Sequence, residues 1–285
     1  RRAAKRLGVN CDSIVGSGRG GRIRERDVLA AAGSLAAAGG GAAATFGGGN
    51  TATAEVLTLS NLRRTIGSRL MRSQTETVPV TLHTRVDASN LVSLREQFKT
   101  QGKAAGSDVV VPSYTDLVVK LCAAVLQQQP RFAARWQDDK LVVPASFDMG
   151  VAVDTDEGLM VPVVRGVERL KVAELSRVTS DLISRARSQQ LRLDELQGGV
   201  FTVTNLGAFG IDGFTPVIHW PETTILGLGA IRREPTVVAD DRIEPRWQMT
   251  LSLTFDHRAT DGAPAARFLQ TIRTALENPA AWLLV

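Results

Sequence analysis

The chain has 285 residues, of which 44% are hydrophobic and 22% are charged. This composition indicates a globular protein with one sizeable core and room for a small second domain. No stretch approaches the 18 apolar residues of a membrane-spanning helix, and two cysteines, Cys11 and Cys122, exclude a disulfide framework and fit a reducing compartment. Because the first residue is Arg1 and not Met, we expect an N-terminal part of the protein to precede it.

The net charge of +5 is concentrated in the first 33 residues, which hold eight basic and three acidic side chains. This imbalance predicts that residues 1–33 form a small basic module with an acidic partner. A nucleic-acid-binding patch is the alternative. It is disfavoured because no aromatic residues interleave with the basic ones.

The module is expected to contain a helix over residues 1–7, a glycine-rich turn over 16–21 and a second helix from about 25 to 32. Residues 34–54 consist mainly of glycine and alanine with no periodicity, which predicts a flexible linker. An alanine-rich helix competes for part of this stretch, but its glycine triplets oppose a helix.

From residue 55 to the end, strand and helix patterns interleave and predict one larger domain. Apolar residues alternate with period two over 78–86 and 249–255, which is typical of half-buried strands. Ser113 and Asp116 predict a capping box at the start of a helix that Pro130 closes. A second amphipathic helix is expected over 171–190. We therefore predict a mixed α/β sandwich with helices packed on a sheet.

The densest chemical signal is Phe-Asp-His-Arg-Ala-Thr-Asp-Gly over residues 255–262. His257 follows a predicted strand and continues its apolar face, so it is a candidate general base in an apolar setting. Asp261 and Gly262 then turn the chain into a helix. The alternative is a buried structural histidine with Asp261 as a helix cap. Cys122 lies on the buried face of a predicted helix, which argues against a nucleophile, and three scattered histidines predict no metal site.

His257-x-x-x-Asp261-Gly262 is similar to the active-site signature of dihydrolipoamide acyltransferases and chloramphenicol acetyltransferases. Three further segments resemble the dihydrolipoamide acyltransferase family in the same order, at residues 151–163, 198–207 and 216–227. The resemblance covers residues 55–285. It implies a chloramphenicol-acetyltransferase-like fold and transfer of an acyl group between dihydrolipoamide and coenzyme A, with lipoate carried on a lipoyl domain absent from this chain.

The resemblance also implies roles for individual residues. His257 would take the proton of the attacking thiol, since only a thiolate attacks well. Thr204 would stabilise the oxyanion, and it would meet His257 across a trimer interface. Asp261 would hold the loop, with Arg63 or Arg64 as its partner.

Residues 1–33 resemble the peripheral subunit-binding domain of the same family. In relatives, basic residues at the positions of Arg1, Lys5 and Arg22 clasp acidic groups of a partner. The resemblance thus implies that this module binds the dehydrogenase (decarboxylase) and dihydrolipoamide dehydrogenase components of a 2-oxo acid dehydrogenase complex. Such a protein would be cytoplasmic in bacteria and in the mitochondrial matrix in eukaryotes.

Several alternatives stay open. Acetyl is the expected acyl group because residues 209–218 resemble the acetyltransferase members of the family. Succinyl and branched-chain groups are the alternatives. Relatives tend to carry Asn-Pro-Pro-Glu where this chain has His219-Trp220-Pro221-Glu222, which bears on specificity. A core protein without catalysis and a chloramphenicol-type acetyltransferase are the competing functions. Trimers are expected to assemble into a 24-mer or 60-mer through the apolar tail 282–285, although that tail could instead pack on its own subunit.

Overall fold

The computed structural model describes residues 10, 14–18, 20–31, 57–105 and 110–284. The chain divides into two compact units, Arg1–Leu57 and Thr58–Val285. The expected helix over 1–7 and the expected linker over 34–54 lie outside the described residues. Each unit is considered by itself.

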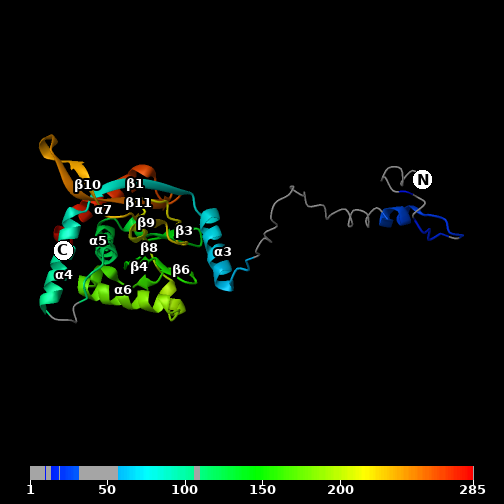
Figure 1. Cartoon of the computed structure of the whole chain (residues 1–285), viewed down its shortest axis with the longest axis horizontal. Helices are drawn as coiled ribbons and strands as arrows, with labels where there is room; N and C mark the ends of the chain where they lie inside the picture. The colour runs from blue at the N-terminus through cyan, green and yellow to red at the C-terminus, as the bar shows by residue number, and fades with distance from the viewer. Residues whose placement is uncertain (1–9, 11–13, 19, 32–56, 106–109, 285) are drawn as a thin grey trace, which may run out of the picture. The chain divides into compact units, whose positions relative to one another are not determined.

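The larger unit is built on a mixed sheet with the strand order β1-β11-β9-β8-β4-β7, while β10 pairs with β11 beyond this path (Figure 1). β8 is parallel to β9 and β4, and the other pairs are antiparallel. The strands are β1 (Pro79–Asp87), β4 (Met149–Val151), β7 (Val163–Val164), β8 (Phe201–Asn205), β9 (Thr224–Leu228), β10 (Arg232–Val237) and β11 (Ile243–Asp256). Two small hairpins add β2 (Arg135–Gln137) with β3 (Lys140–Val142), and β5 (Val153–Thr155) with β6 (Gly158–Met160).

Helices α4 (Ser89–Ala105), α5 (Tyr114–Gln128), α6 (Val172–Arg187), α7 (Gly262–Glu277) and α8 (Pro279–Leu283) gather on one side of this sheet, which confirms the predicted mixed α/β architecture. Helix α3 (Asn61–Glu76) lies apart from them. Alternate residues of β11, from Met249 to Phe255, point into the core with α5 and α7. On β8, Phe201 points the same way and packs edge-to-face with Phe268, with 6.0 Å between the ring centroids.

The predicted capping box is confirmed at the start of α5. Ser113 accepts a hydrogen bond from the Asp116 N–H at 3.0 Å, and Asp116 accepts one from the Ser113 N–H at 2.8 Å. The helix ends at Gln128, just before Pro130. Most of its apolar residues are fully buried, so α5 is the central helix of the core.

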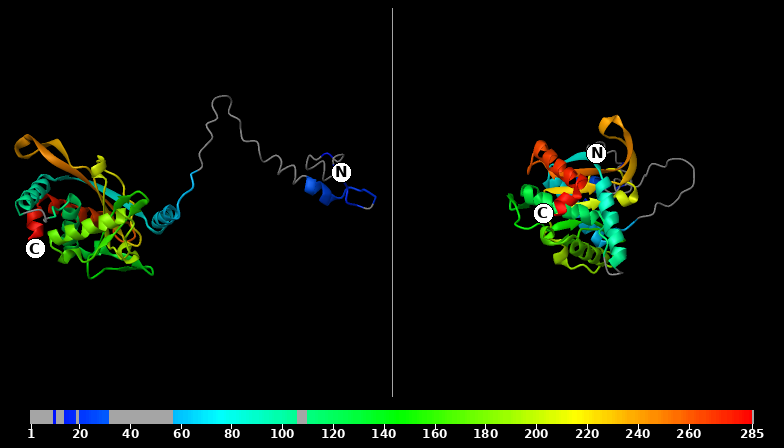
Figure 2. Two further views of the ribbon diagram at one scale, coloured as in Figure 1. Left: turned by 60° about the horizontal axis from the view of Figure 1, so that its bottom comes forward. Right: turned by 90° about the vertical axis from the view of Figure 1, so that its left-hand side faces the viewer.

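Two elements extend away from this body. Only Ser73 of α3 is buried, while Leu70 and Met71 on the same helix are exposed. The β10–β11 hairpin projects from the sheet as an arm (Figures 1 and 2).

The C-terminal tail packs partly on its own subunit. Trp282 and Leu283 contact the core, whereas Leu284 is 88% exposed. Within one chain, most of the tail therefore follows the alternative in which it folds back, and Leu284 alone of its described residues faces outward.

Candidate active site

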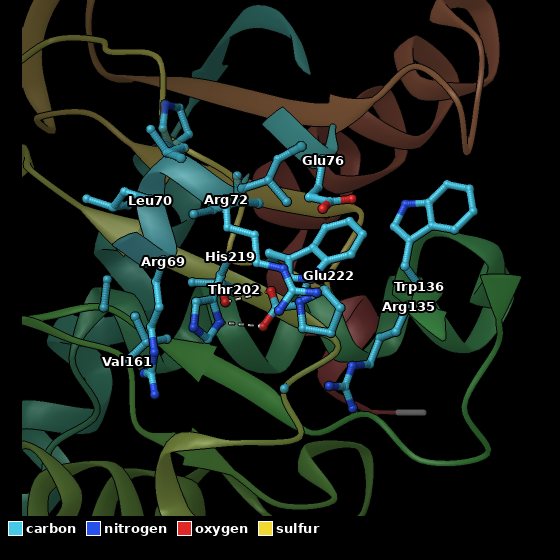
Figure 3. Close-up of a pocket in the computed structure, with 18 of the residues that line it drawn as sticks. Arg69, Leu70, Arg72, Glu76, Arg135, Trp136, Val161, Thr202, His219 and Glu222 are labelled. Carbon is cyan, nitrogen blue, oxygen red and sulfur yellow. Dashed lines mark hydrogen bonds and ion pairs between the residues drawn. The ribbon is translucent and has the colours of Figure 1, made fainter. Parts of the chain in front are cut away.

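A cavity of about 940 Å³ opens on the face of the sheet opposite the main helices (Figure 3). Thr202 and Thr204 of β8 line its floor. Its walls come from α3, the β2–β3 hairpin and residues 216–222. Since strand side chains alternate between faces, Phe201 and Val203 fill the core while the two threonines face the cavity.

Thr204 is partly buried at the carboxyl end of β8. The next residue, Asn205, donates a hydrogen bond from its amide to Thr115 Oγ1 at 3.0 Å and accepts one from the Gly207 N–H at 2.8 Å. These bonds fix the end of the strand. A hydroxyl in this position can donate a hydrogen bond to a ligand oxygen in the cavity.

His257 follows β11 directly, as predicted, and its N–H donates to Val78 O at 2.8 Å. The expectation of an apolar setting is wrong for the single chain, because the side chain is 43% exposed. The reason is that the strand ends at Asp256, so His257 lies at the rim of a small hollow of about 230 Å³ and outside the core. Its ring is therefore accessible to a thiol.

Asp261 lies beside His257, with 3.9 Å between Asp261 Oδ1 and His257 Nδ1. The carboxyl is 84% exposed and does not cap α7 with its side chain, although Asp261 is the N-cap residue. Gly262 begins α7, and a Cβ there would have open space. Arg63 and Arg64 are exposed on α3, and within the described part of one chain neither forms an ion pair with Asp261.

Thr204 and His257 do not meet within one chain. Thr204 pairs with Gly227, which in turn pairs with Ser252, so these three residues are level across the sheet. His257 is five residues farther along from Ser252, a distance of about 16 Å in extended chain. Two strand spacings, about 10 Å, separate them sideways. A single subunit thus places its hydroxyl and its imidazole in different hollows.

The neighbours of His257 form a network that the sequence did not reveal. Asp256 is fully buried and accepts hydrogen bonds from Trp136 Nε1 at 2.9 Å and from the Arg258 guanidinium at 2.8 Å. The guanidinium also lies over the Trp136 ring, 4.5 Å from its centroid. Burial raises the pKa of Asp256, but the hydrogen bonds from Arg258 and the Val78 N–H outweigh it and lower the pKa. The two residues that flank His257 are therefore fixed.

A second network lies in the cavity. Glu222 is 1% exposed and accepts hydrogen bonds from Thr202 Oγ1 at 2.7 Å and from His219 Nδ1 at 3.0 Å. Burial lowers the pKa of His219, while the hydrogen bond and the charge of Glu222 raise it, and the net shift is upward. The feature of the sequence that pointed to this network was His219-Trp220-Pro221-Glu222, which stands where relatives tend to carry Asn-Pro-Pro-Glu.

The smaller unit is held together around Asp27. Its carboxylate accepts hydrogen bonds from the Ser17 hydroxyl at 2.7 Å, the Arg24 N–H at 2.8 Å and the Ser17 N–H at 2.9 Å. These bonds, led by the Ser17 hydroxyl, lower the pKa of Asp27 to about 2. Residues 25–31 are helical, as predicted, and Arg22 is exposed before them. Arg1 and Lys5 lie outside the described residues.

A cysteine nucleophile, a metal site and a membrane-spanning helix find little support in the described residues. Burial raises the pKa of the Cys122 thiol well above its usual range, so no reactive thiolate is available there. Within the described ranges, no group of three or more His, Cys, Asp or Glu side chains is arranged to hold a metal ion. Each helix in the described part of the chain is too short or too polar to cross a lipid bilayer.

Family comparisons match both units of the chain. The model of the 2-oxoacid dehydrogenases acyltransferase catalytic domain matches residues 51–284, and that of the e3 binding domain matches residues 1–29.

Named relatives fall into two acyl classes. The acetyltransferase component of the acetoin cleaving system of Bacillus subtilis (strain 168) is 35% identical over all of this chain and 69% of its own length. The succinyltransferase component of the 2-oxoglutarate dehydrogenase complex from the same organism is 34% identical with the same coverage.

Solved structures agree with these matches. The dihydrolipoamide acetyltransferase of Azotobacter vinelandii has a TM-score of 0.76 and 31% identity, covering 81% of this chain and 94% of that chain. The cubic core of a pyruvate dehydrogenase multienzyme complex has a TM-score of 0.77 and 32% identity, and the match covers 84% of this chain and 96% of that chain.

Proposed function

Because this chain belongs to the family of 2-oxoacid dehydrogenase acyltransferases, we propose that it transfers an acyl group between dihydrolipoamide and coenzyme A. One observation carries the proposal. Residues 51–284 match the family, and within them Thr204 places a hydroxyl in a large cavity while His257 is accessible at the end of the long strand β11.

The chemistry follows from these two groups. His257 takes the proton of the attacking thiol as its sulfur bonds to the thioester carbonyl carbon. Thr204 donates a hydrogen bond to the resulting oxyanion, which lowers the activation barrier by roughly 3–4 kcal/mol. When the intermediate collapses, the C–S bond breaks and the departing thiolate recovers the proton from His257.

The separation of Thr204 and His257 in one chain supports a site formed between subunits. We infer that the chain is a homotrimer in which Thr204 of one subunit faces His257 of the next. The Azotobacter vinelandii structure was used to examine a serine, a histidine and an asparagine in catalysis, the last two being four positions apart. His257 and Asp261 have the same spacing here, which supports Asp261 as the residue that holds the loop, with Arg63 or Arg64 of a neighbouring subunit as its partner.

The smaller unit gives the protein a second role as a scaffold. We infer that residues 1–33 bind the dehydrogenase and dihydrolipoamide dehydrogenase components, with Arg1, Lys5 and Arg22 as the contacting residues, and that residues 34–54 link them to the catalytic domain 55–285. The match to an e3 binding domain and the exposure of Arg22 support this assignment. Assembly of trimers into a 24-mer or 60-mer core is part of the same proposal and is supported by the likeness to a cubic core.

Acetyl is the proposed acyl group on the strength of residues 209–218. The relatives do not distinguish it from succinyl, since members of the two classes are 35% and 34% identical to this chain. The decisive assay offers acetyl-, succinyl- and isobutyryl-CoA with dihydrolipoamide. Transfer from acetyl-CoA with the highest kcat/KM is expected. Absence of transfer from all three would favour a core protein without catalysis.

A further inference from the structure

One end of the large cavity collects cationic side chains around a histidine. His219 lines this end together with Arg69 of α3 and Arg135 of β2. The positive charges of Arg69 and Arg135 are close enough to act on the imidazole and oppose its protonation. Figure 3 shows the two arginines on either side of the His219–Glu222 pair.

The imidazole is held in place by a buried chain of hydrogen bonds. Glu222 Oε1 accepts from His219 Nδ1, and Glu222 Oε2 accepts from Thr202 Oγ1. Gly199 leaves the space for this carboxylate, because a Cβ there would lie 2.6 Å from Glu222 Oε1. With Nδ1 engaged, Nε2 is the remaining hydrogen-bonding atom of His219.

The charges at this end are not balanced within the subunit. Among the residues that the structure describes, Arg69, Arg72 and Arg135 form no ion pair, and Arg135 Nε is buried without a hydrogen-bond partner. The cavity also has acidic lining residues, but Glu76 and Asp139 act on Arg258 at the other end. Near His219, the carboxylate whose charge acts most on the imidazole is Glu222, and it is already bonded to Thr202.

We propose that His219, Arg69 and Arg135 form an anion-binding subsite within the acyl-transfer cavity. This inference rests on the proposed function in that the anion belongs to a substrate. Thr202, which is bonded to Glu222, is two residues from Thr204 on the same strand face, or about 7 Å. Because Thr204 and His219 line the same cavity, the subsite is within reach of a charged group on a substrate whose thioester lies against the Thr204 hydroxyl.

Two substrate groups have the required chemistry. One is a carboxylate at the far end of a dicarboxylic acyl group, and the other is a phosphate of coenzyme A. Both present oxygen acceptors that arginine and imidazolium bind through charge-assisted hydrogen bonds. The two groups can be told apart by removing positive charge from the subsite, because each predicts that a different set of ligands loses affinity.

The test measures binding by calorimetry, which requires no turnover and so separates this inference from the proposed function. The variants are His219→Asn, which retains an amide donor without the charge, and Arg135→Met. Arg187→Met is the matched control, because Arg187 is an exposed arginine on α6 away from the cavity. Circular dichroism and particle mass establish that each variant folds and assembles. The ligands are coenzyme A, acetyl-CoA, succinyl-CoA and the neutral fragment pantetheine.

We expect about a tenfold loss of affinity in both cavity variants, the scale of one hydrogen bond to a charged group. Loss confined to succinyl-CoA assigns the subsite to an acyl carboxylate. Loss for coenzyme A and both thioesters, with pantetheine unaffected, assigns it to a phosphate. Affinities within twofold of the control for all ligands, or an equal loss for pantetheine, would overturn the proposal.

Discussion

His257 is fixed through its backbone and not through its side chain. Its N–H bonds to Val78 O, while Asp256 and Arg258 on either side are tied to each other and to Trp136. The imidazole Nδ1 lies 3.9 Å from Asp261 Oδ1. This arrangement leaves the imidazole exposed at the surface of the subunit, as the proposed role of a general base requires.

His257→Ala should fold and assemble normally while losing acyl transfer by about a hundredfold or more, the usual scale for a general base. Steady-state assay at neutral pH measures the loss. His83→Asn is the matched control, since His83 bonds to Ser252 within the sheet and has no part in the mechanism. Retention of more than about a tenth of the activity would remove His257 from the mechanism.

Thr204→Ala should lower kcat by roughly a hundredfold with little change in coenzyme A affinity, because the hydroxyl acts mainly on charge that develops in the transition state. Thr204→Ser retains the hydroxyl and should remain active. The comparison of kcat and KM in the two variants checks the assignment. Equal behaviour of the alanine and serine variants contradicts an oxyanion role.

Among the elements, α5 shows how a local signal supports the site. Its capping box starts a largely buried helix, and Thr115 in its first turn accepts the hydrogen bond that fixes Asn205 at the end of β8. The helix start thus connects to the strand that carries Thr204. Loss of the cap should therefore lower the stability of the folded protein.

Ser113→Ala should destabilise the protein by about 1 kcal/mol, since the Asp116 N–H loses its partner at the helix N-terminus. Urea unfolding at one fixed protein concentration measures the change. Ser188→Ala is the control, because that hydroxyl bonds only to backbone oxygens near the exposed end of α6. Equal stability of the two variants would show that the cap contributes nothing measurable.

At the scale of the whole molecule, the proposed function assigns partner binding to residues 1–33 and acyl transfer to residues 55–285. Removal of residues 1–54 should leave transfer to free dihydrolipoamide intact and abolish binding of the dehydrogenase components. Arg22→Glu in the full chain should weaken that binding, with a smaller difference from the wild type at high salt, because opposite charge drives the encounter. Sedimentation with purified partner enzymes tests both. Undiminished binding by the truncated protein refutes the module assignment.

Residues 282–285 allow a test of the proposed assembly of trimers. Removal of residues 282–285 should yield active trimers in place of a large particle, since burial of the exposed Leu284 side chain against another subunit is favourable. Trp282 and Leu283 already contact their own core, so some loss of thermal stability is expected as well. Light scattering gives the mass. A particle of unchanged mass would show that the tail serves its own subunit.

The sequence by itself determined the features that depend on near neighbours in the chain. The period-two strands ending at Asp87 and Asp256, the Ser113 capping box and the helix after Arg24 all follow from local patterns, because caps and strand faces are set by residues a few positions apart.

Only the tertiary structure decided what depends on strand order and chain reversal. Trp136 reaches Asp256 across 120 positions, and residues 216–222 fold over β8 so that Glu222 bonds to Thr202. The strand order β11-β9-β8 keeps Thr204 and His257 in separate hollows of one chain. No local pattern encodes these distances, since they arise from the way the buried strands pack side by side.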